Sequence, residues 1–177
     1  FYPSIAGTLL IHELGGMKDI SWMNYLKLRL NWAQVGAATG VYRTISTYDQ
    51  GTNWGNMALF SVGNTLQNPN LRPEFTNSIE AGIEAYFFES RIGVDLAVYK
   101  TNSFDQIFDV PVSTASGYSF MFVNGGEIEN KGMEVALHLV PVKTRDFTWN
   151  IDVNWFTNEN TVISLAEGVT SLQLFSA

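Results

Sequence analysis

The sequence predicts an all-β protein, an antiparallel transmembrane β-barrel segment of about six long strands. Apolar and polar residues alternate along several runs, most clearly in residues 78–102. Such a period of two is typical of strands with one apolar face. The clearest runs are about eleven residues long, which suits a tilted strand that crosses a bilayer. Short polar connections alternate with long ones, as in outer-membrane barrels.

The central hairpin consists of two alternating runs joined by a polar turn at residues 89–90. Apolar side chains take the odd positions in residues 78–88 and the even positions in residues 92–98. Antiparallel counting from the turn places Glu84 opposite Asp95. One face of the hairpin is therefore apolar, and the other carries carboxylates.

The chain before this hairpin contains two further strand candidates. Residues 3–11 form a short apolar run, and residues 26–33 alternate cleanly, with Lys27 and Arg29 on the polar parity. Residues 36–67 are expected to be a long loop region, within which residues 41–47 could form a strand. Connections of this length usually carry function or are disordered.

The chain after the hairpin is expected to begin with a second long loop, residues 104–118, because proline and small polar residues interrupt the alternation there. Two more strands are expected around residues 133–139 and 147–155. Gly132 suggests a bulge or a close backbone approach. The aromatic residues beside the short turns suit an interfacial girdle; they are Phe87, Phe88, Phe147 and Trp149.

Composition excludes several classes of function. The 177 residues contain no cysteine, so disulfides, thiolate metal sites and cysteine nucleophiles are absent. The formal charge of −7 argues against a nucleic-acid partner, which requires a basic surface. No apolar run is long enough for a spanning helix, which needs about 18 residues. His12 and His138 lack ligand-spaced partners, so no metal site and no cofactor are expected.

Two other architectures fit part of the pattern. A soluble carbohydrate-binding β-sandwich also has alternating strands, although its strands are usually about six residues long. A self-contained small outer-membrane barrel with a passive or structural role would need about eight strands. It would therefore require residues 41–47 and 57–62 to cross the membrane as well.

An ordered set of stretches resembles the SusC/RagA family of TonB-dependent outer-membrane transporters. These stretches are YLKLRLNWAQVG from Tyr25, NPNLRPEFTNSIEAGIEAYFF from Asn68, RIGVDLAVYKTNSFDQI from Arg91, VNGGEIENKGMEVAL from Val123 and FTWNIDVNWFTNENTVISL from Phe147. The resemblance implies a barrel of about 22 strands. The whole chain, residues 1–177, is then expected to be a partial barrel domain, an internal fragment of the barrel's later half, without the plug and the amino-terminal extension.

The resemblance also implies a function: active import of oligosaccharides, or of peptides, across the outer membrane of a Gram-negative bacterium. A SusD-like surface lipoprotein would cover the outer opening of the barrel. TonB, ExbB and ExbD would supply energy through the missing amino-terminal part, and outer-membrane lipid would surround the wall. No enzyme activity is expected.

Two groups of residues are candidates for a role in such a wall. Arg29 has the parity to neutralise the facing carboxylates Glu84 and Asp95, which predicts a structural charge cluster in the lumen. A glycosidase interpretation of the paired carboxylates is not favoured, and no catalytic residue is expected. Aromatic side chains in the long loops could stack on sugar rings; they are Tyr42, Tyr48, Trp54, Tyr118, Phe120 and Phe122.

Overall fold

The computed structural model describes residues 2–15 and 20–165. Its long strands are β1 (Ser4–Leu10), β2 (Met23–Ala37), β6 (Glu74–Phe87), β7 (Ile92–Pro111), β8 (Phe120–Lys143) and β9 (Thr148–Ser164). Three short strands, β3 (Tyr48–Gln50), β4 (Phe60–Val62) and β5 (Thr65–Leu66), and two 3-10 turns, η1 (Ile11–Glu13) and η3 (Thr114–Ser116), complete the elements. Among the residues described, no helix is both long and apolar enough for a membrane span.

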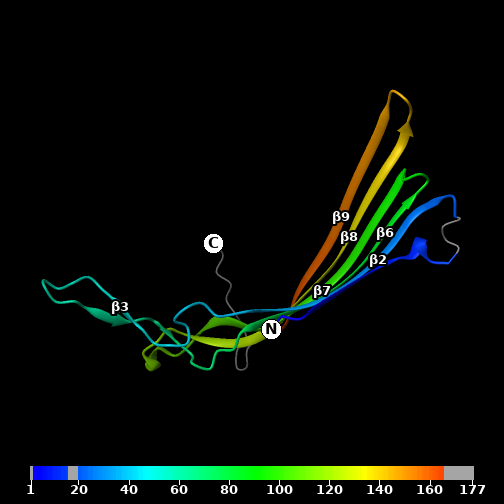
Figure 1. Ribbon diagram of the computed structural model, residues 1–177. Coiled ribbons are helices and arrows are strands. Elements are labelled where there is room, and N and C mark those ends of the chain that lie inside the picture. Colours follow the sequence, from blue (N-terminus) through cyan, green and yellow to red (C-terminus); the bar gives the residue numbers. More distant parts are fainter. Residues whose placement is uncertain (1, 16–19, 166–177) are drawn as a thin grey trace. The chain divides into compact units, whose positions relative to one another are not determined.

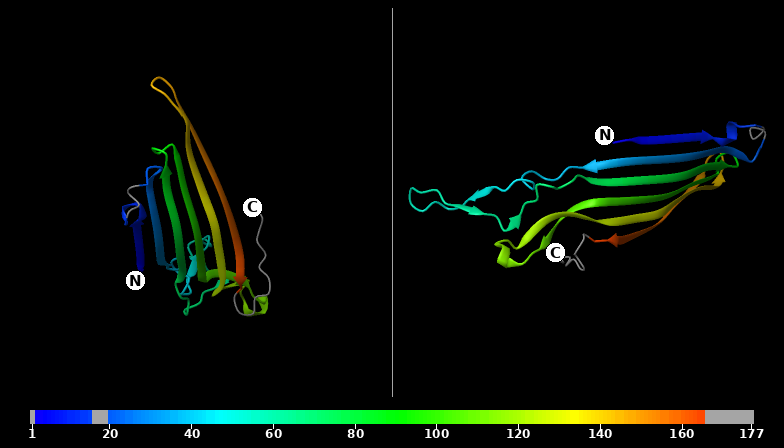
Figure 2. Two further views of the ribbon diagram at one scale, coloured as in Figure 1. Left: turned by 90° about the vertical axis from the view of Figure 1, so that its right-hand side faces the viewer. Right: turned by 90° about the horizontal axis from the view of Figure 1, so that it is seen from below.

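The long strands lie side by side in chain order, β1-β2-β6-β7-β8, with β9 beside β8 and β5 on the same sheet (Figures 1 and 2). Strands β3 and β4 form a separate two-stranded sheet. Each long strand therefore pairs with its neighbour in the chain, as in an up-and-down barrel wall. The prediction of six long strands is confirmed.

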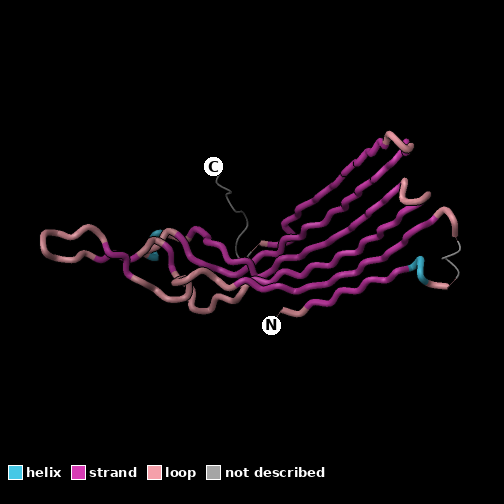
Figure 3. Tube along the Cα trace, turned by 45° about the horizontal axis from the view of Figure 1, so that its top comes forward, coloured by secondary structure: helices cyan, strands magenta, loops and turns pink. Residues whose placement is uncertain are grey.

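The chain divides into two compact units. The wall unit comprises residues 1–35, 77–102 and 129–161, and the loop unit comprises residues 36–76, 103–128 and 162–177. In the wall unit, η1 and the turns that join β6 to β7 and β8 to β9 lie at the same end of the sheet (Figure 3). These are the short connections that the sequence predicts.

The wall unit has an apolar face and a polar face. In β1 and β2, Ile5 pairs with Trp32 and Leu9 with Leu28, so that these side chains share one face. Large apolar side chains of the same parity remain exposed in β1, β2, β6, β7 and β9; they include Leu30, Ile79, Ile83, Val98, Val153 and Trp155. Of all described hydrophobic residues, only Ala85 and Val110 are buried. The sheet therefore needs an apolar medium or partner on this face.

One loop prediction is wrong, and one possible strand does not form. Strand β7 continues to Pro111, so residues 104–111, just over half of the loop predicted at 104–118, are strand. The proline ends β7 without interrupting its pairing, because a proline is tolerated where no further ladder bond is needed. Residues 41–47 contain no strand, whereas β3, β4 and β5 occupy part of the region predicted to be loop.

These differences bear on the two alternative architectures. A small closed barrel requires residues 41–47 and 57–62 to span the membrane, yet the former are not a strand and β4 has three residues. A β-sandwich requires a second sheet packed on the apolar face, and the described wall strands form one layer. The structure supports neither.

Candidate functional site

A charge cluster lies on the polar face of the wall unit, across strands β2, β6 and β7. The guanidinium of Arg29 donates to both carboxylate oxygens of Asp95, at 2.6 and 3.1 Å, and approaches Glu84 at 3.4 Å. Lys27 also forms an ion pair with Glu84. Two cations thus face two carboxylates, and the structure brings together all three residues that the sequence assigns to the cluster.

The register of the central hairpin explains why the two acids face each other. The hydroxyls of Ser78 and Thr101 are 3.0 Å apart across β6 and β7. Counting from that pair along antiparallel strands puts Glu84 opposite Asp95. Facing carboxylates repel unless a cation lies between them, and Arg29 takes that place from β2.

Three glycines on the polar face make room for large side chains. A Cβ at Gly82 would meet the guanidinium of Arg29 at 2.9 Å, and one at Gly93 would meet the ring of Tyr86 at 2.8 Å. At Gly132 it would overlap the hydroxyl of Tyr99. The close approach predicted at Gly132 is confirmed. Gly82 and Gly93 sit within alternating runs, where no sequence signal separates them from ordinary small residues.

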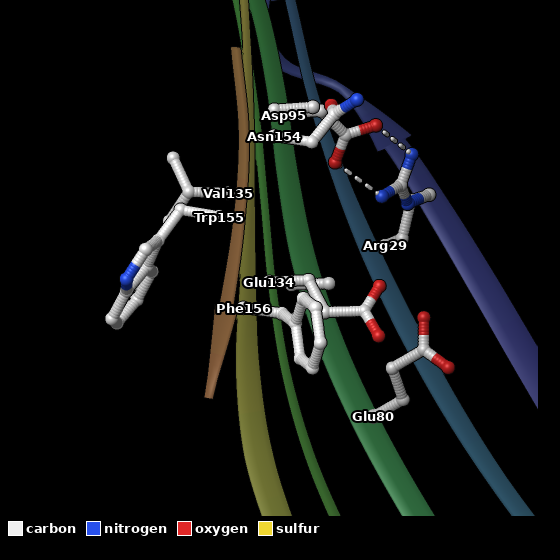
Figure 4. A pocket seen from close by; sticks show the side chains of 10 residues that line it. Arg29, Glu80, Asp95, Glu134, Val135, Asn154, Trp155 and Phe156 are labelled. Atoms are coloured by element: carbon white, nitrogen blue, oxygen red, sulfur yellow. Dashed lines mark hydrogen bonds and ion pairs between the residues drawn. The ribbon is translucent and has the colours of Figure 1, made fainter. Parts of the chain in front are cut away.

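A hollow of about 440 Å³ adjoins the cluster in the wall unit. Figure 4 shows Arg29, Glu80, Asp95, Glu134 and Phe156 on the same side of the sheet, while Val135 and Trp155 point away from it. The hollow thus combines carboxylates with one exposed aromatic ring. Phe156 is not among the residues predicted from the sequence. Its even position places it on the same face of β9 as Asn154, and that parity is a usable signal.

The six predicted loop aromatics all lie in the loop unit, but in different environments. Tyr42, Tyr48 and Trp54 are 69 to 76% exposed. Tyr118 is half-buried. The loop assignment is wrong for Phe120 and Phe122, which belong to β8. The ring of Phe122 lies 4.9 Å from the guanidinium carbon of Arg43, so a protein cation already occupies one face of it.

A polar network in the loop unit holds the segment before β6 against β7 and β8. The side-chain amide of Asn124 donates to the carbonyls of Arg72 and Asp105, and its oxygen accepts from the backbone N–H of Arg72. The guanidinium of Arg72 also pairs with Asp105 at 2.5 Å. These contacts fix the chain where the long loop region returns to the sheet.

The described residues contain no group of three or more His, Asp or Glu side chains that could hold a metal ion. The closest acid and histidine pair on the wall is His138 Nδ1 with Asp152, at 2.6 Å. The chemistry that this arrangement offers is therefore polar contact and charge balance along a wall.

A comparison with protein families gives a match over most of the chain. The model described as TonB dependent receptor-like, beta-barrel matches residues 15–171. TonB-dependent receptor P26 of Formosa agariphila is 33% identical over 178 residues, covering 98% of this chain and 18% of that protein. TonB-dependent receptor SusC of Bacteroides thetaiotaomicron is 31% identical over 177 residues, covering 94% of this chain and 17% of that protein. The chain spans less than a fifth of the length of these relatives.

Solved structures share the fold. The RagAB peptide importer in its 'closed-closed' state superposes with a TM-score of 0.85 at 21% identity, covering 98% of this chain and 19% of that one. The siderophore receptor PirA from Pseudomonas aeruginosa gives a TM-score of 0.54 at 17% identity, covering 91% of this chain and 28% of that one. At such identities the likeness concerns the fold alone. The sheet is thus a segment of barrel wall, which accounts for its exposed apolar face.

Proposed function

Because the chain belongs to the TonB-dependent receptor β-barrel family, we propose that it forms part of the wall and surface loops of an outer-membrane importer. Family membership over residues 15–171 is the observation that carries this proposal. Receptors and transporters of this family are not enzymes, and the chain is not one. The sheet has one apolar face for lipid and one polar face for a water-filled or plugged interior.

The proposed importer is a longer protein in which this chain is one part of the barrel domain. Its later half is the expected location, and a plug and an amino-terminal extension would be supplied by other parts. Energy would come from TonB, ExbB and ExbD through those parts. In this setting the cluster of Arg29, Glu84 and Asp95 faces the lumen and stabilises the wall.

The proposed partner is a SusD-like surface lipoprotein. Support comes from the 31% identity to SusC and from the fold shared with the RagAB peptide importer. The proposed substrates are oligosaccharides or peptides, both of which offer groups that aromatic rings bind. Tyr42, Tyr48 and Trp54 are the best placed of the loop aromatics, because their rings are largely exposed.

Uptake by cells tests this proposal. The gene for the full-length protein would be deleted and restored in its native host, and uptake of labelled oligosaccharide and peptide mixtures would be followed with and without TonB. We expect uptake of one class to require both the gene and TonB. If cells lacking the gene took up every class of substrate as well as the restored strain does, the proposal would be contradicted.

Substitution of the exposed loop rings tests the substrate contact. Tyr48→Ala and Trp54→Ala are each expected to raise the half-saturating substrate concentration by about 2- to 13-fold, the value of one aromatic contact. Phe147→Ala, which removes an exposed ring beside a short turn, is the control and leaves uptake unchanged. Equal effects of all three substitutions would argue against a role of these loops in binding.

A further inference from the structure

A ladder of charged side chains crosses the apolar face of the wall unit. Lys100 takes an even position in β7, like the apolar residues 92–98, and Lys131 takes an odd position in β8, like the apolar residues 133–139. Glu129 and Glu159 complete the ladder. The side chain of Glu129 accepts from Lys100 at 2.7 Å and lies 3.8 Å from Lys131, which is 3.3 Å from Glu159.

This ladder lies where the apolar band ends. Along β2, β6, β7, β8 and β9, the first residue of this parity beyond the apolar run is polar; these residues are Gln34, Asn77, Lys100, Lys131 and Thr157, with Glu159 following. Trp32 and Trp155, where the uninterrupted apolar runs of β2 and β9 end, mark the same limit. Aromatic residues followed by charges are typical of the edge of the hydrocarbon layer.

The ladder is on the side of the outer leaflet. The short turns of the wall unit lie at the opposite end of these strands, after Phe87 and Lys143. Short turns of outer-membrane barrels are periplasmic. The charges therefore meet the headgroups of the outer leaflet.

The two ammonium groups have donors to spare for a lipid anion. An ammonium carries three donors, and Lys100 has one short ion pair. The carboxylate oxygens near Lys131, at 3.3 and 3.8 Å, lie beyond ordinary hydrogen-bond length. Both lysine side chains are about half exposed, at 52 and 50%, whereas Glu129 between them is 16% exposed. The carboxylate of Glu129, which contacts both lysines, is therefore largely covered, while the ammonium groups of Lys100 and Lys131 project from the wall.

From this arrangement we propose that Lys100 and Lys131 bind the phosphate group of an outer-leaflet lipid. Two projecting ammonium groups at the edge of an apolar surface offer charge to the phosphate and apolar contact to the acyl chains below it. Glu129 keeps the two lysines side by side and limits their affinity for phosphate. The inference rests on the proposed outer-membrane location, but not on import.

Lipid A is the probe that tests this inference. Binding of lipid A and of its dephosphorylated form would be measured by native mass spectrometry on the full-length protein in uncharged detergent at fixed salt, since salt screens such contacts. We expect a preference for the phosphorylated form. Lys100→Gln and Lys131→Gln should each lower its affinity by about 5-fold, the effect of one basic residue near a charged surface.

Two further variants make the test specific. Glu129→Gln should raise the affinity for lipid A, because it removes the anion that competes with phosphate. Lys143→Gln removes an exposed lysine at the short-turn end of β8 and should leave the affinity unchanged. Equal affinities for both forms of lipid A, or lysine variants indistinguishable from Lys143→Gln, would overturn the inference. Uptake by the same variants reports separately on import.

Discussion

The charge cluster on the polar face allows a quantitative prediction. Arg29→Gln removes the cation that lies between two facing carboxylates, while keeping most of the side-chain volume. Asp95 then loses both of its close contacts, at 2.6 and 3.1 Å, and Glu84 keeps Lys27. The variant therefore leaves one carboxylate without compensation beside another.

The magnitude follows from the exposure of the cluster. Hydrogen bonds to charged groups contribute about 1.5–3 kcal/mol, but exposed pairs contribute less than about 1 kcal/mol. Arg29 is 32% exposed and Asp95 39% exposed, so each of the two contacts between them contributes about 1 kcal/mol, between these cases. We expect Arg29→Gln to lower the free energy of unfolding by about 2 kcal/mol. Asp95→Asn should cost about half of that, because it also removes the repulsion from Glu84.

A double-mutant cycle is the assay. The free energy of unfolding of the full-length protein in lipid vesicles would be measured by tryptophan fluorescence in denaturant. The variant with both Arg29→Gln and Asp95→Asn should be no less stable than Arg29→Gln alone, which corresponds to a coupling of about 1 kcal/mol. Arg91→Gln, at the turn of the same hairpin, is the control and has little effect. Additivity of the two substitutions within about 0.5 kcal/mol would refute the reasoning.

Two other substitutions test the two faces of the wall. Gly132→Ala should destabilise the protein by about 1–3 kcal/mol, because the added Cβ overlaps the hydroxyl of Tyr99. At Gly7 an added Cβ meets no atom within 4 Å, so Gly7→Ala should be neutral. Equal unfolding free energies for the two variants would contradict the packing described. Leu30→Arg places a charge on the apolar face and should cost about 2–4 kcal/mol in a bilayer, while Asn31→Arg on the opposite face should cost little. The folding yields of these two variants in vesicles would be measured by heat-dependent gel mobility. A lower folding yield for Asn31→Arg than for Leu30→Arg would reverse the assignment of faces.

The strands were predictable from the sequence because each carries its own alternation. Residues 26–33, 78–88 and 92–98 show it without interruption, and β2, β6 and β7 are found there. The opposition of Glu84 and Asp95 followed from counting across one tight turn. For Arg29, the sequence predicts only that its side chain lies on the same face as the two acids. Its contact with them could not be predicted, because the long loop region between β2 and β6 leaves the register of these strands undetermined.

The remaining features depend on information that local patterns lack. Strands β7 and β8 extend through residues 103–111 and 120–128, where the sequences SFDQIFDVP and FMFVNGGEI do not alternate cleanly. Such strand ends are stabilised by pairing with their neighbours, which is a tertiary effect. The network around Asn124 joins residues that are 19 and 52 positions apart in the chain. No local pattern around Asn124 identifies these partners.

The central claim is that the apolar parity of the wall faces lipid. Spin labels on single cysteines at residues 93–98 of β7, in the full-length protein in vesicles, test it most directly, since this stretch has no native cysteine. We expect oxygen dissolved in the bilayer to reach labels at the even positions and a water-soluble relaxant to reach those at the odd positions, with a period of two. Equal accessibility of neighbouring positions, or the opposite parity, would contradict the account.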